Sequence, residues 1–163
     1  MINTDMEFSF STRSHEETIF AGKRLGKAVE PGCVVGLIGD LGAGKTCFMK
    51  GVANGLNDVP ESEVTSPTFT ILQAYEGTVP LYHFDAYRLE GVEDLEDIGF
   101  DDYVYAQGVS FIEWADNINE AIPEERMLIE IELKGDEDRL FKCSAEGEKH
   151  EAILNKFVKS LEN

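Results

Sequence analysis

A glycine-rich turn between an apolar run and a helical pattern constrains the fold of this chain more than any other feature. The stretch Gly39–Thr46, with the sequence GDLGAGKT, fits the phosphate-binding loop pattern G-x-x-x-x-G-K-[ST]. Glycines let the backbone take positive φ values and approach a polyphosphate closely, so that successive N–H groups form an anion-binding hollow. In this pattern Lys45 contacts the β- and γ-phosphates, and the hydroxyl of Thr46 binds Mg²⁺.

The segments on either side of the loop support that interpretation. Cys33–Ile38 is apolar and predicts a buried strand, and Thr46–Leu56 predicts a helix whose N-terminus faces the phosphates. The alternative is an ordinary glycine-rich turn, but the four fixed positions arise by chance in about one of two hundred chains of this length. We therefore predict that the loop binds a nucleoside triphosphate.

Length and charge narrow the possible functions. Residues 1–163 have the length of a single domain, which we expect to be a P-loop domain, and 42% hydrophobic residues suffice for a core. The sequence has 32 acidic and 14 basic residues, which gives a formal charge of -18. Binding of nucleic acid depends on neutralising phosphates with Lys and Arg, so this charge opposes a direct contact with nucleic acid.

Cysteine usage and the length of the apolar runs indicate a cytoplasmic protein. Cys33, Cys47 and Cys143 are odd in number and widely spaced, so we expect free thiols rather than a disulfide framework or a zinc site. No apolar run approaches the roughly 18 residues of a membrane span, and the first residues lack the pattern of a signal peptide. We expect a soluble protein with no membrane contact.

Several further segments carry strand or helix patterns. Alternating polarity predicts an edge strand at Met6–Ser11, and β-rich runs predict two hairpins and a buried strand. The hairpins pair Thr68–Tyr75 with Val79–Phe84 and Met127–Leu133 with Arg139–Ser144, and the buried strand is Val109–Trp114. A short acidic helix is predicted at Gly91–Gly99 and a short helix or turn at Asp101–Tyr105. A C-terminal helix carries the apolar stripe Ile153, Leu154, Phe157, Val158 and Leu161.

A capping box opens the first predicted helix. Ser14 and the glutamate three residues later have the S-x-x-E form, and the apolar residues Ile19, Phe20, Leu25 and Val29 predict its buried face. Together these elements predict an α/β fold of the P-loop NTPase type with three layers. Helices flank a central mixed sheet, which carries antiparallel hairpins.

Two predicted strands end in an acid. Asp85 follows one arm of the first hairpin, and Glu113 lies near the end of the buried strand. Ligands gather beyond the carboxyl ends of strands in open α/β sheets, and nucleotide hydrolases use carboxylates there to hold Mg²⁺ or the attacking water. We therefore predict that Asp85 and Glu113 act in catalysis together with Lys45.

Four motifs occur in a specific order along almost the whole chain. They are GDLGAGKT at Gly39–Thr46, SPTF at Ser66–Phe69, HFDAYRL at His83–Leu89 and IEW at Ile112–Trp114. In this combination the chain resembles the TsaE (YjeE) family, small bacterial ATPases required to form N6-threonylcarbamoyladenosine at position 37 of tRNAs. The resemblance implies ATP and Mg²⁺ as cofactors, and it implies TsaB and TsaD as partner proteins that carry out the tRNA chemistry.

The resemblance also implies roles for individual residues. The family pattern assigns the phosphates to Asp40–Lys45 and magnesium to Thr46 and Glu113. It places Asp85 near the γ-phosphate and a switch-like loop at Ser66–Phe69.

Other positions resemble those that flank the nucleotide base or sugar. These are Arg139 and the region of Ser14 and His15. Cys47 stands where the family commonly has a second threonine. This difference leaves the backbone N–H in place. The predicted nucleotide-binding residues are thus Ser14, His15, Asp40, Leu41, Gly42, Ala43, Gly44, Lys45, Thr46, Cys47, Asp85 and Arg139.

Other functions share the phosphate loop. A GTPase would carry the guanine-reading pattern N-K-x-D, but Asn155–Val158 lacks the acid. A P-loop small-molecule kinase stays the main alternative, although no arginine-rich lid to hold a transferred phosphoryl group is visible. The acidic segment Gly91–Asp102 is either a docking surface for a basic partner or a solvated face, and any contact with tRNA is expected to be indirect.

Overall fold

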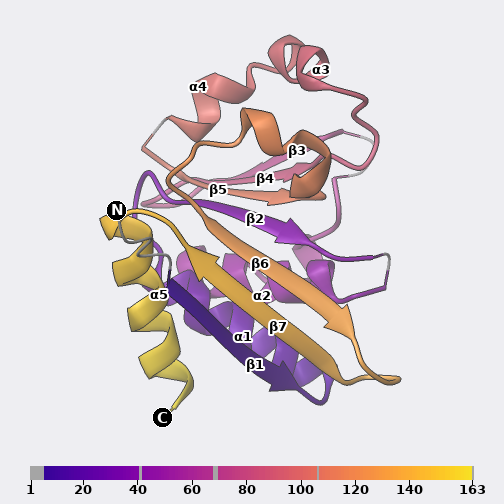
Figure 1. Ribbon diagram of the computed structural model, residues 1–163, viewed down its shortest axis with the longest axis vertical. Coiled ribbons are helices and arrows are strands. Elements are labelled where there is room, and N and C mark those ends of the chain that lie inside the picture. Colours follow the sequence, from indigo (N-terminus) through magenta and orange to yellow (C-terminus); the bar gives the residue numbers. More distant parts are fainter. Residues whose placement is uncertain (1–5, 41, 68–69, 106, 163) are drawn as a thin grey trace.

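A seven-stranded sheet runs through the computed structural model, which describes residues 6–40, 42–67, 70–105 and 107–162 (Figure 1). The strands lie in the order β1-β7-β6-β2-β5-β4-β3, so β1 is an edge strand, as predicted. Their bounds are β1 Met6–Thr12, β2 Val34–Ile38, β3 Leu72–Tyr75, β4 Leu81–Asp85, β5 Val109–Glu113, β6 Met127–Leu133 and β7 Arg139–Ala145.

The centre of the sheet is parallel and its margins are antiparallel. β2 pairs in parallel with β5 and β6, and β4 pairs in parallel with β5. Both predicted hairpins, β3 with β4 and β6 with β7, are confirmed. β5 is buried along its whole length, as expected for a parallel strand covered on both faces. The carboxyl ends of β2, β4 and β5 therefore meet at one edge of the sheet.

Helices on both faces confirm the predicted three-layer α/β fold (Figure 1). α1, α2 and α5 pack on one face, and α3, α4 and the 3₁₀ helix η2 cover the other face of the β2-β5-β4 region. Val35 and Leu37 of β2 join the first core, whereas Val34 joins the second. The bounds are α1 His15–Ala28, α2 Lys45–Asn57, η1 Glu61–Glu63, α3 Val92–Asp97, α4 Phe100–Val104, η2 Ala115–Ala121 and α5 Glu148–Leu161.

The helix pair α1 and α2 packs through glycines rather than through large side chains. A Cβ atom at Gly22 would lie 2.2 Å from the carbonyl oxygen of Phe48, and one at Gly51 would lie 2.0 Å from that of Ile19. The predicted buried face of α1 is therefore wrong in part, because Phe20 is 46% exposed and Ile19 is only half-buried. Because the two backbones approach closely, α1 is oriented with its small residues, and not its bulkiest ones, facing α2.

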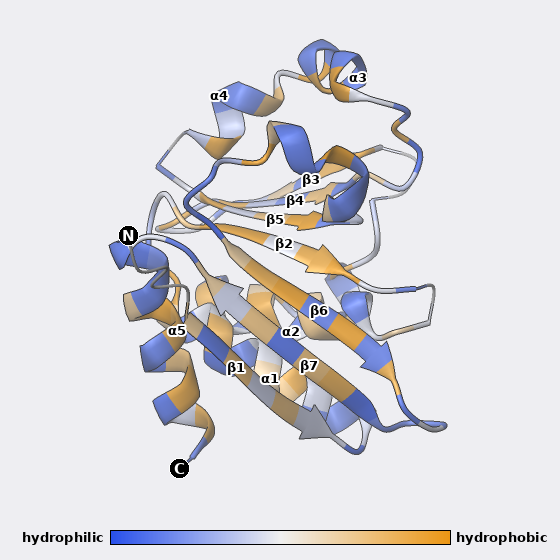
Figure 2. Ribbon diagram, in the orientation of Figure 1, coloured by the Kyte–Doolittle hydropathy of each residue, from blue (hydrophilic) through white to orange (hydrophobic). Residues whose placement is uncertain are grey.

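The C-terminal helix α5 packs as its apolar stripe predicted. Figure 2 shows its alternation of hydrophobic and hydrophilic residues, in contrast to the mostly hydrophobic strand β2 at the sheet centre. Phe157 lies edge-on to Phe10 of β1 at 5.7 Å between ring centroids, and Phe10 stacks on Phe141 of β7 at 4.6 Å. None of the helices in the described parts of the chain is long and apolar enough to cross a membrane.

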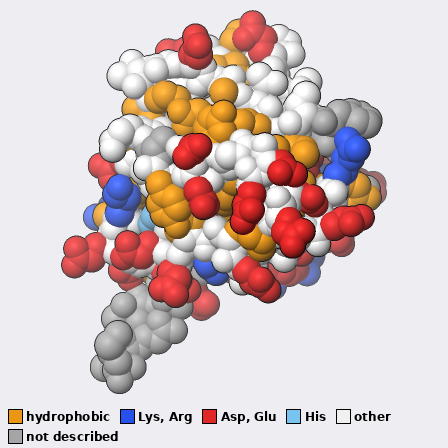
Figure 3. Space-filling model, turned by 90° about the horizontal axis from the view of Figure 1, so that it is seen from above, with side chains coloured by type: hydrophobic (Ala, Val, Ile, Leu, Met, Phe, Trp, Pro, Cys, Tyr) orange, Lys and Arg blue, Asp and Glu red, His pale blue; other side chains and the backbone are white. Residues whose placement is uncertain are grey.

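The layer formed by α3, α4 and η2 is strongly acidic. Between Leu89 and Glu125 the sequence contains twelve acidic residues and no Lys, Arg or His. Seen from above in Figure 3, acidic side chains are spread among hydrophobic ones, and Lys and Arg side chains lie toward the margins. The predicted short acidic helix is confirmed as α3, and the predicted short helix or turn is the helix α4.

Candidate nucleotide-binding site

The phosphate-binding loop joins the carboxyl end of β2 to the first turn of α2. Gly44 caps α2 with a φ of 107°, and Gly42 has a φ of 82°, both in the left-handed region that favours glycine. A Cβ atom at Gly39 would lie 2.7 Å from the carbonyl oxygen of Ile131 on β6. These glycines are thus required by backbone geometry, and they bring the first-turn amides of α2, which lack intrahelical partners, to the edge of the sheet.

Arg139 braces this loop from the start of β7. Its buried side chain donates from Nε to the carbonyl of Ala43 at 2.8 Å and from Nη2 to the carbonyl of Gly42 at 3.2 Å. Nη1 donates to the carbonyls of Asp136 and Asp138 in the β6–β7 turn. Because the guanidinium holds two loop carbonyls, Arg139 ties the loop to the hairpin, and its predicted contact with the base or sugar stays a prediction.

Lys45, the lysine of the phosphate-binding loop, is buried. The residue is 6% exposed, and Nζ donates to the carbonyls of Gly39 and, at 3.2 Å, of Asp40. Burial lowers the pKa of Lys45, while the carboxylates of Glu113 and Asp85 oppose that shift. The ammonium therefore already lies among the loop carbonyls and opposite the two strand-end acids.

An aromatic pair forms one wall around Lys45. Nζ lies 4.0 Å from the centroid of the Trp114 ring, a distance at which a cation and an aromatic face attract. Trp114 has a φ of 59°, and its left-handed turn carries the chain from β5 into η2. The Tyr87 ring lies 4.9 Å from that of Trp114. The sequence patterns had assigned no role to either ring.

The two strand-end acids lie side by side. Asp85 of β4 and Glu113 of β5 are register partners, and each is 2% exposed. Oδ2 of Asp85 accepts from the hydroxyl of Ser66 at 2.8 Å, and Oδ1 accepts from the backbone N–H of Tyr87 at 2.9 Å. Asp85 is therefore joined to the loop that contains the predicted switch motif, of which positions 68 and 69 lie outside the described residues.

Glu113 has a different partner, which the sequence patterns missed. Nε2 of His83, a fully buried residue of β4, lies 2.6 Å from Oε2 of Glu113. The signal was present in the two-residue period of β4, because His83 stands between Leu81 and Asp85 on one face of the strand. A polar residue at that inward position indicates a buried partner.

These groups line a cavity of about 380 Å³. It brings together ten of the predicted nucleotide-binding residues, namely His15, Asp40, Gly42, Ala43, Gly44, Lys45, Thr46, Cys47, Asp85 and Arg139, and it adds Ser66, Tyr87, Glu113 and Trp114. Ser14 instead caps α1, and its hydroxyl accepts the N–H of Glu17 at 3.1 Å. Leu41 lies outside the described residues.

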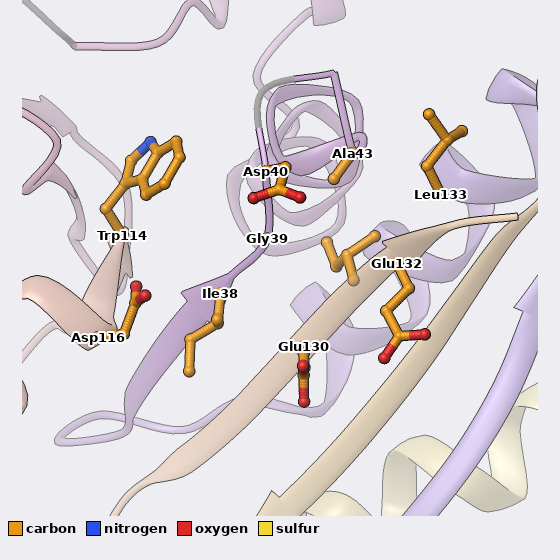
Figure 4. Close-up of a pocket in the computed structure, with 10 residues that line it drawn as sticks. Ile38, Gly39, Asp40, Ala43, Trp114, Asp116, Glu130, Glu132 and Leu133 are labelled. Atoms are coloured by element: carbon orange, nitrogen blue, oxygen red, sulfur yellow. The ribbon is translucent and has the colours of Figure 1, made fainter.

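A second cavity of about 520 Å³ lies on the other side of the loop (Figure 4). It shares Asp40, Ala43 and Trp114 with the first cavity, and β6 contributes Glu130 and Glu132 to its wall. Lys142 and Lys134 beside Glu132 lower the pKa of that carboxyl to about 2. The phosphates are expected in the first cavity, because Lys45 and the start of α2 line it, whereas no Lys or Arg is among the described residues that line the second.

The donor set around Thr46 fits Mg²⁺. The hydroxyl of Thr46 and the carboxylate of Glu113 are the hard oxygen ligands that this ion prefers. No group of three or more His, Cys, Asp or Glu that could hold a metal ion occurs in the described part of the chain. Proteins usually bind Mg²⁺ through one or two side chains, waters and substrate phosphates, so one hydroxyl and one carboxylate suffice as protein ligands.

The cysteines confirm one further expectation. Cys33, Cys47 and Cys143 are free thiols. Burial raises the pKa of Cys33 and of Cys143 to about 12, so neither forms a thiolate near neutral pH. Cys47 is half-buried and lines the cavity.

A family model and two curated relatives that match this chain all carry the name of one protein. A family model described as threonylcarbamoyl adenosine biosynthesis protein TsaE matches residues 12–141. The tRNA threonylcarbamoyladenosine biosynthesis protein TsaE of Bacillus subtilis is 43% identical over 148 residues, which cover 90% of this chain and 91% of the relative. The protein of the same name from Treponema pallidum is 44% identical over 128 residues, or 78% of this chain and 93% of the relative.

A solved structure shares the fold. The crystal structure of YdiB from Bacillus subtilis matches with a TM-score of 0.82 at 36% identity, and the match covers 99% of this chain and 100% of that one. The mixed sheet, its helical layers and the strand-to-loop-to-helix connection at the phosphate loop therefore belong to a known architecture.

Proposed function

This chain belongs to the family of the threonylcarbamoyl adenosine biosynthesis protein TsaE, and on that premise we propose that it binds ATP and hydrolyses it with Mg²⁺. Its hydrolysis serves the system that forms N6-threonylcarbamoyladenosine at position 37 of tRNAs. The observation that carries the proposal is one cavity that combines a phosphate-binding loop, its lysine and two strand-end carboxylates.

The residues of the cavity take distinct roles in this proposal. Lys45 leaves the carbonyls of Gly39 and Asp40 and contacts the β- and γ-phosphates, while the loop amides bind the remaining oxygens. Thr46 and Glu113 hold Mg²⁺, which supplies positive charge to the phosphates when it is bound. Asp85 orients the attacking water or senses the γ-phosphate through Ser66.

Partner proteins complete the activity. TsaB and TsaD are the proposed partners, and they carry out the tRNA chemistry. The formal charge of -18 supports an indirect contact with tRNA, because a polyanion is repelled by an acidic surface with few cations to exchange. A basic partner would instead be attracted to the layer of α3, α4 and η2.

The alternative of a small-molecule kinase has less support. The curated relatives carry names that refer to biosynthesis of a modified tRNA nucleoside, and none of the names quoted above refers to a phosphorylated small molecule. Within the described cavity, Arg139 is bound to loop carbonyls and is not free to hold an acceptor.

ATP consumption in a reconstituted system tests the proposal. The purified protein is assayed alone and then with TsaB, TsaD and unmodified tRNA, and Lys45→Ala serves as the control with weakened ATP binding. The proposal predicts slow hydrolysis alone, a large gain on mixing and formation of the modified nucleoside. No gain in hydrolysis, or a new phosphorylated small molecule in place of free phosphate, would contradict it.

A further inference from the structure

A buried histidine lies behind one of the two strand-end carboxylates. Nε2 of His83 is 2.6 Å from Oε2 of Glu113, and the His83 side chain is completely inaccessible to solvent. Nδ1 of His83 has no hydrogen-bond partner among the residues that the structure describes. Within the described residues, Glu113 is therefore the hydrogen-bond partner of the His83 ring.

The chemistry of the pair fixes which atom donates. An ionised carboxylate only accepts hydrogen bonds, so the proton lies on Nε2 of His83 and is donated to Oε2 of Glu113. A bond to a charged acceptor at this length is stronger than a bond between neutral groups. It engages Oε2 of Glu113, a residue that also lines the cavity.

The charge of Glu113 also acts on Lys45. Burial lowers the pKa of Lys45, and the charge of Glu113 is the largest opposing influence, so the two groups attract each other. Yet no ion pair joins them in the part of the chain that the structure describes, where the carboxylate of Glu113 pairs with His83. Glu113 is bonded to His83, and the ammonium of Lys45 is bonded to the carbonyls of Gly39 and Asp40.

We infer that His83 is a positioning residue, which orients Glu113 toward nucleotide-bound Mg²⁺; the inference rests on the function proposed above. In metal sites, the hydrogen bond that orients a ligand typically accounts for about ten- to a hundredfold in metal affinity or activity. A histidine that merely filled the core would affect stability but not the dependence on Mg²⁺.

Matched variants separate positioning from core filling. His83→Leu removes the donor at similar bulk, and His83→Gln restores an N–H near the place of Nε2. His150→Leu removes another buried histidine, whose Nε2 accepts the backbone N–H of Val34 at 3.0 Å on the opposite end of β2. Thermal melting establishes that each variant folds.

Calorimetric titration with ATP, in EDTA and in excess Mg²⁺, measures the gain in affinity that Mg²⁺ supplies. For His83→Leu this gain should fall by about tenfold, with affinity in EDTA kept within about twofold of the unaltered protein. Hydrolysis with the partner proteins should fall by about ten- to a hundredfold. His83→Gln should recover most of both, and His150→Leu should retain the full gain.

Each other outcome has a defined meaning. An unchanged Mg²⁺ gain in His83→Leu, or an equal loss in His150→Leu, overturns the inference. If Glu113→Gln also keeps the full gain, the proposed metal role of Glu113 is itself wrong, which distinguishes the two failures. If His83→Leu does not fold, His83→Asn is used in its place, because the shorter amide of asparagine does not reach Glu113. The inference is then overturned if Mg²⁺ raises the ATP affinity of His83→Asn and His83→Gln equally.

Discussion

Both ends of the parallel strands bury polar side chains, but the partners of these groups differ. At the carboxyl end, Asp85, Glu113 and Lys45 line a cavity next to the phosphate loop. At the amino end, His150 of α5 accepts the N–H of Val34, where β2 begins. The polar groups at the carboxyl end face a space for a ligand, whereas His150 satisfies a backbone donor. Burial of a polar group therefore does not by itself indicate a role in ligand binding.

At the carboxyl end, the two acids are held in different ways, one by a residue of the sheet and the other by a residue of a loop. Glu113 is held by His83 within the sheet, while Asp85 is held by Ser66 from the loop after α2. Ile71, near the end of that loop, has a φ of 69°, a strained value for a β-branched residue. This difference suits a metal ligand that stays in place and a carboxylate that responds to the nucleotide.

Glu113→Gln should have the largest effect. The amide can still accept from His83, so the unfolding free energy at neutral pH should change by less than about 1 kcal/mol. Hydrolysis of ATP with the partner proteins should fall by about a thousandfold, because a charge near the phosphates is lost. Parallel phosphate-release and urea-unfolding assays measure the two effects. Full hydrolysis by this variant would show that the carboxyl end is not the catalytic end.

His150 should show the opposite behaviour. Burial, with a smaller contribution from the Lys149 charge, lowers the pKa of His150 from 6.5 to about 4. The unfolded chain therefore binds more protons between these values, so stability from this group is complete above pH 6.5 and is lost as the pH falls to about 4. The loss amounts to about 3 kcal/mol. Urea unfolding across this pH range measures it, and His150→Gln should flatten the profile without changing ATP binding.

Asp85→Asn should impair hydrolysis less than Glu113→Gln does. Loss of a group that places the attacking water costs about a hundredfold in rate. In the proposal Asp85 contacts the loop and does not bind the metal. The Mg²⁺ concentration for half-maximal hydrolysis should therefore stay within about twofold of its original value. A titration of the rate with Mg²⁺ measures both quantities. A raised Mg²⁺ requirement equal to that of Glu113→Gln would remove the distinction between the two acids.

Lys45→Ala should act mainly on binding. Removing its charge-assisted contact should weaken ATP binding by about 1.5–3 kcal/mol, which is about ten- to a hundredfold in the dissociation constant. The fold should persist, because the variant also removes an ammonium whose pKa is lowered by burial. Competition against a fluorescent nucleotide measures the affinity. An unchanged dissociation constant would contradict the role of the phosphate loop.

Most of the fold and the composition of the phosphate cavity could be predicted from the sequence. The phosphate loop, both hairpins and the acids at the ends of β4 and β5 all have local signals, either fixed glycines or a change of hydrophobic period. The buried face of α1 could not be predicted from bulk, because Gly22 meets Gly51 only through packing of two helices distant in sequence. Likewise, Phe20 gives no local sign that it remains exposed.

The hydrogen-bond partners within the site were the least predictable part. His83 meets Glu113, and Arg139 meets the loop, only because β4 lies beside β5 and the β6–β7 hairpin reaches the end of β2. The burial of Lys45 also depends on Trp114, which lies over it from another strand end. Such pairings are set by strand order, which sequence periodicity does not specify.

Titration of the isolated protein with ATP in a calorimeter, with and without Mg²⁺, tests the central claim most directly. The account predicts saturable binding of one ATP per chain that strengthens when Mg²⁺ is present, and it predicts loss of that strengthening in Glu113→Gln. Absence of ATP binding, or binding that is the same with Mg²⁺ and with EDTA, would contradict a phosphate loop and a carboxylate that act together on one magnesium nucleotide.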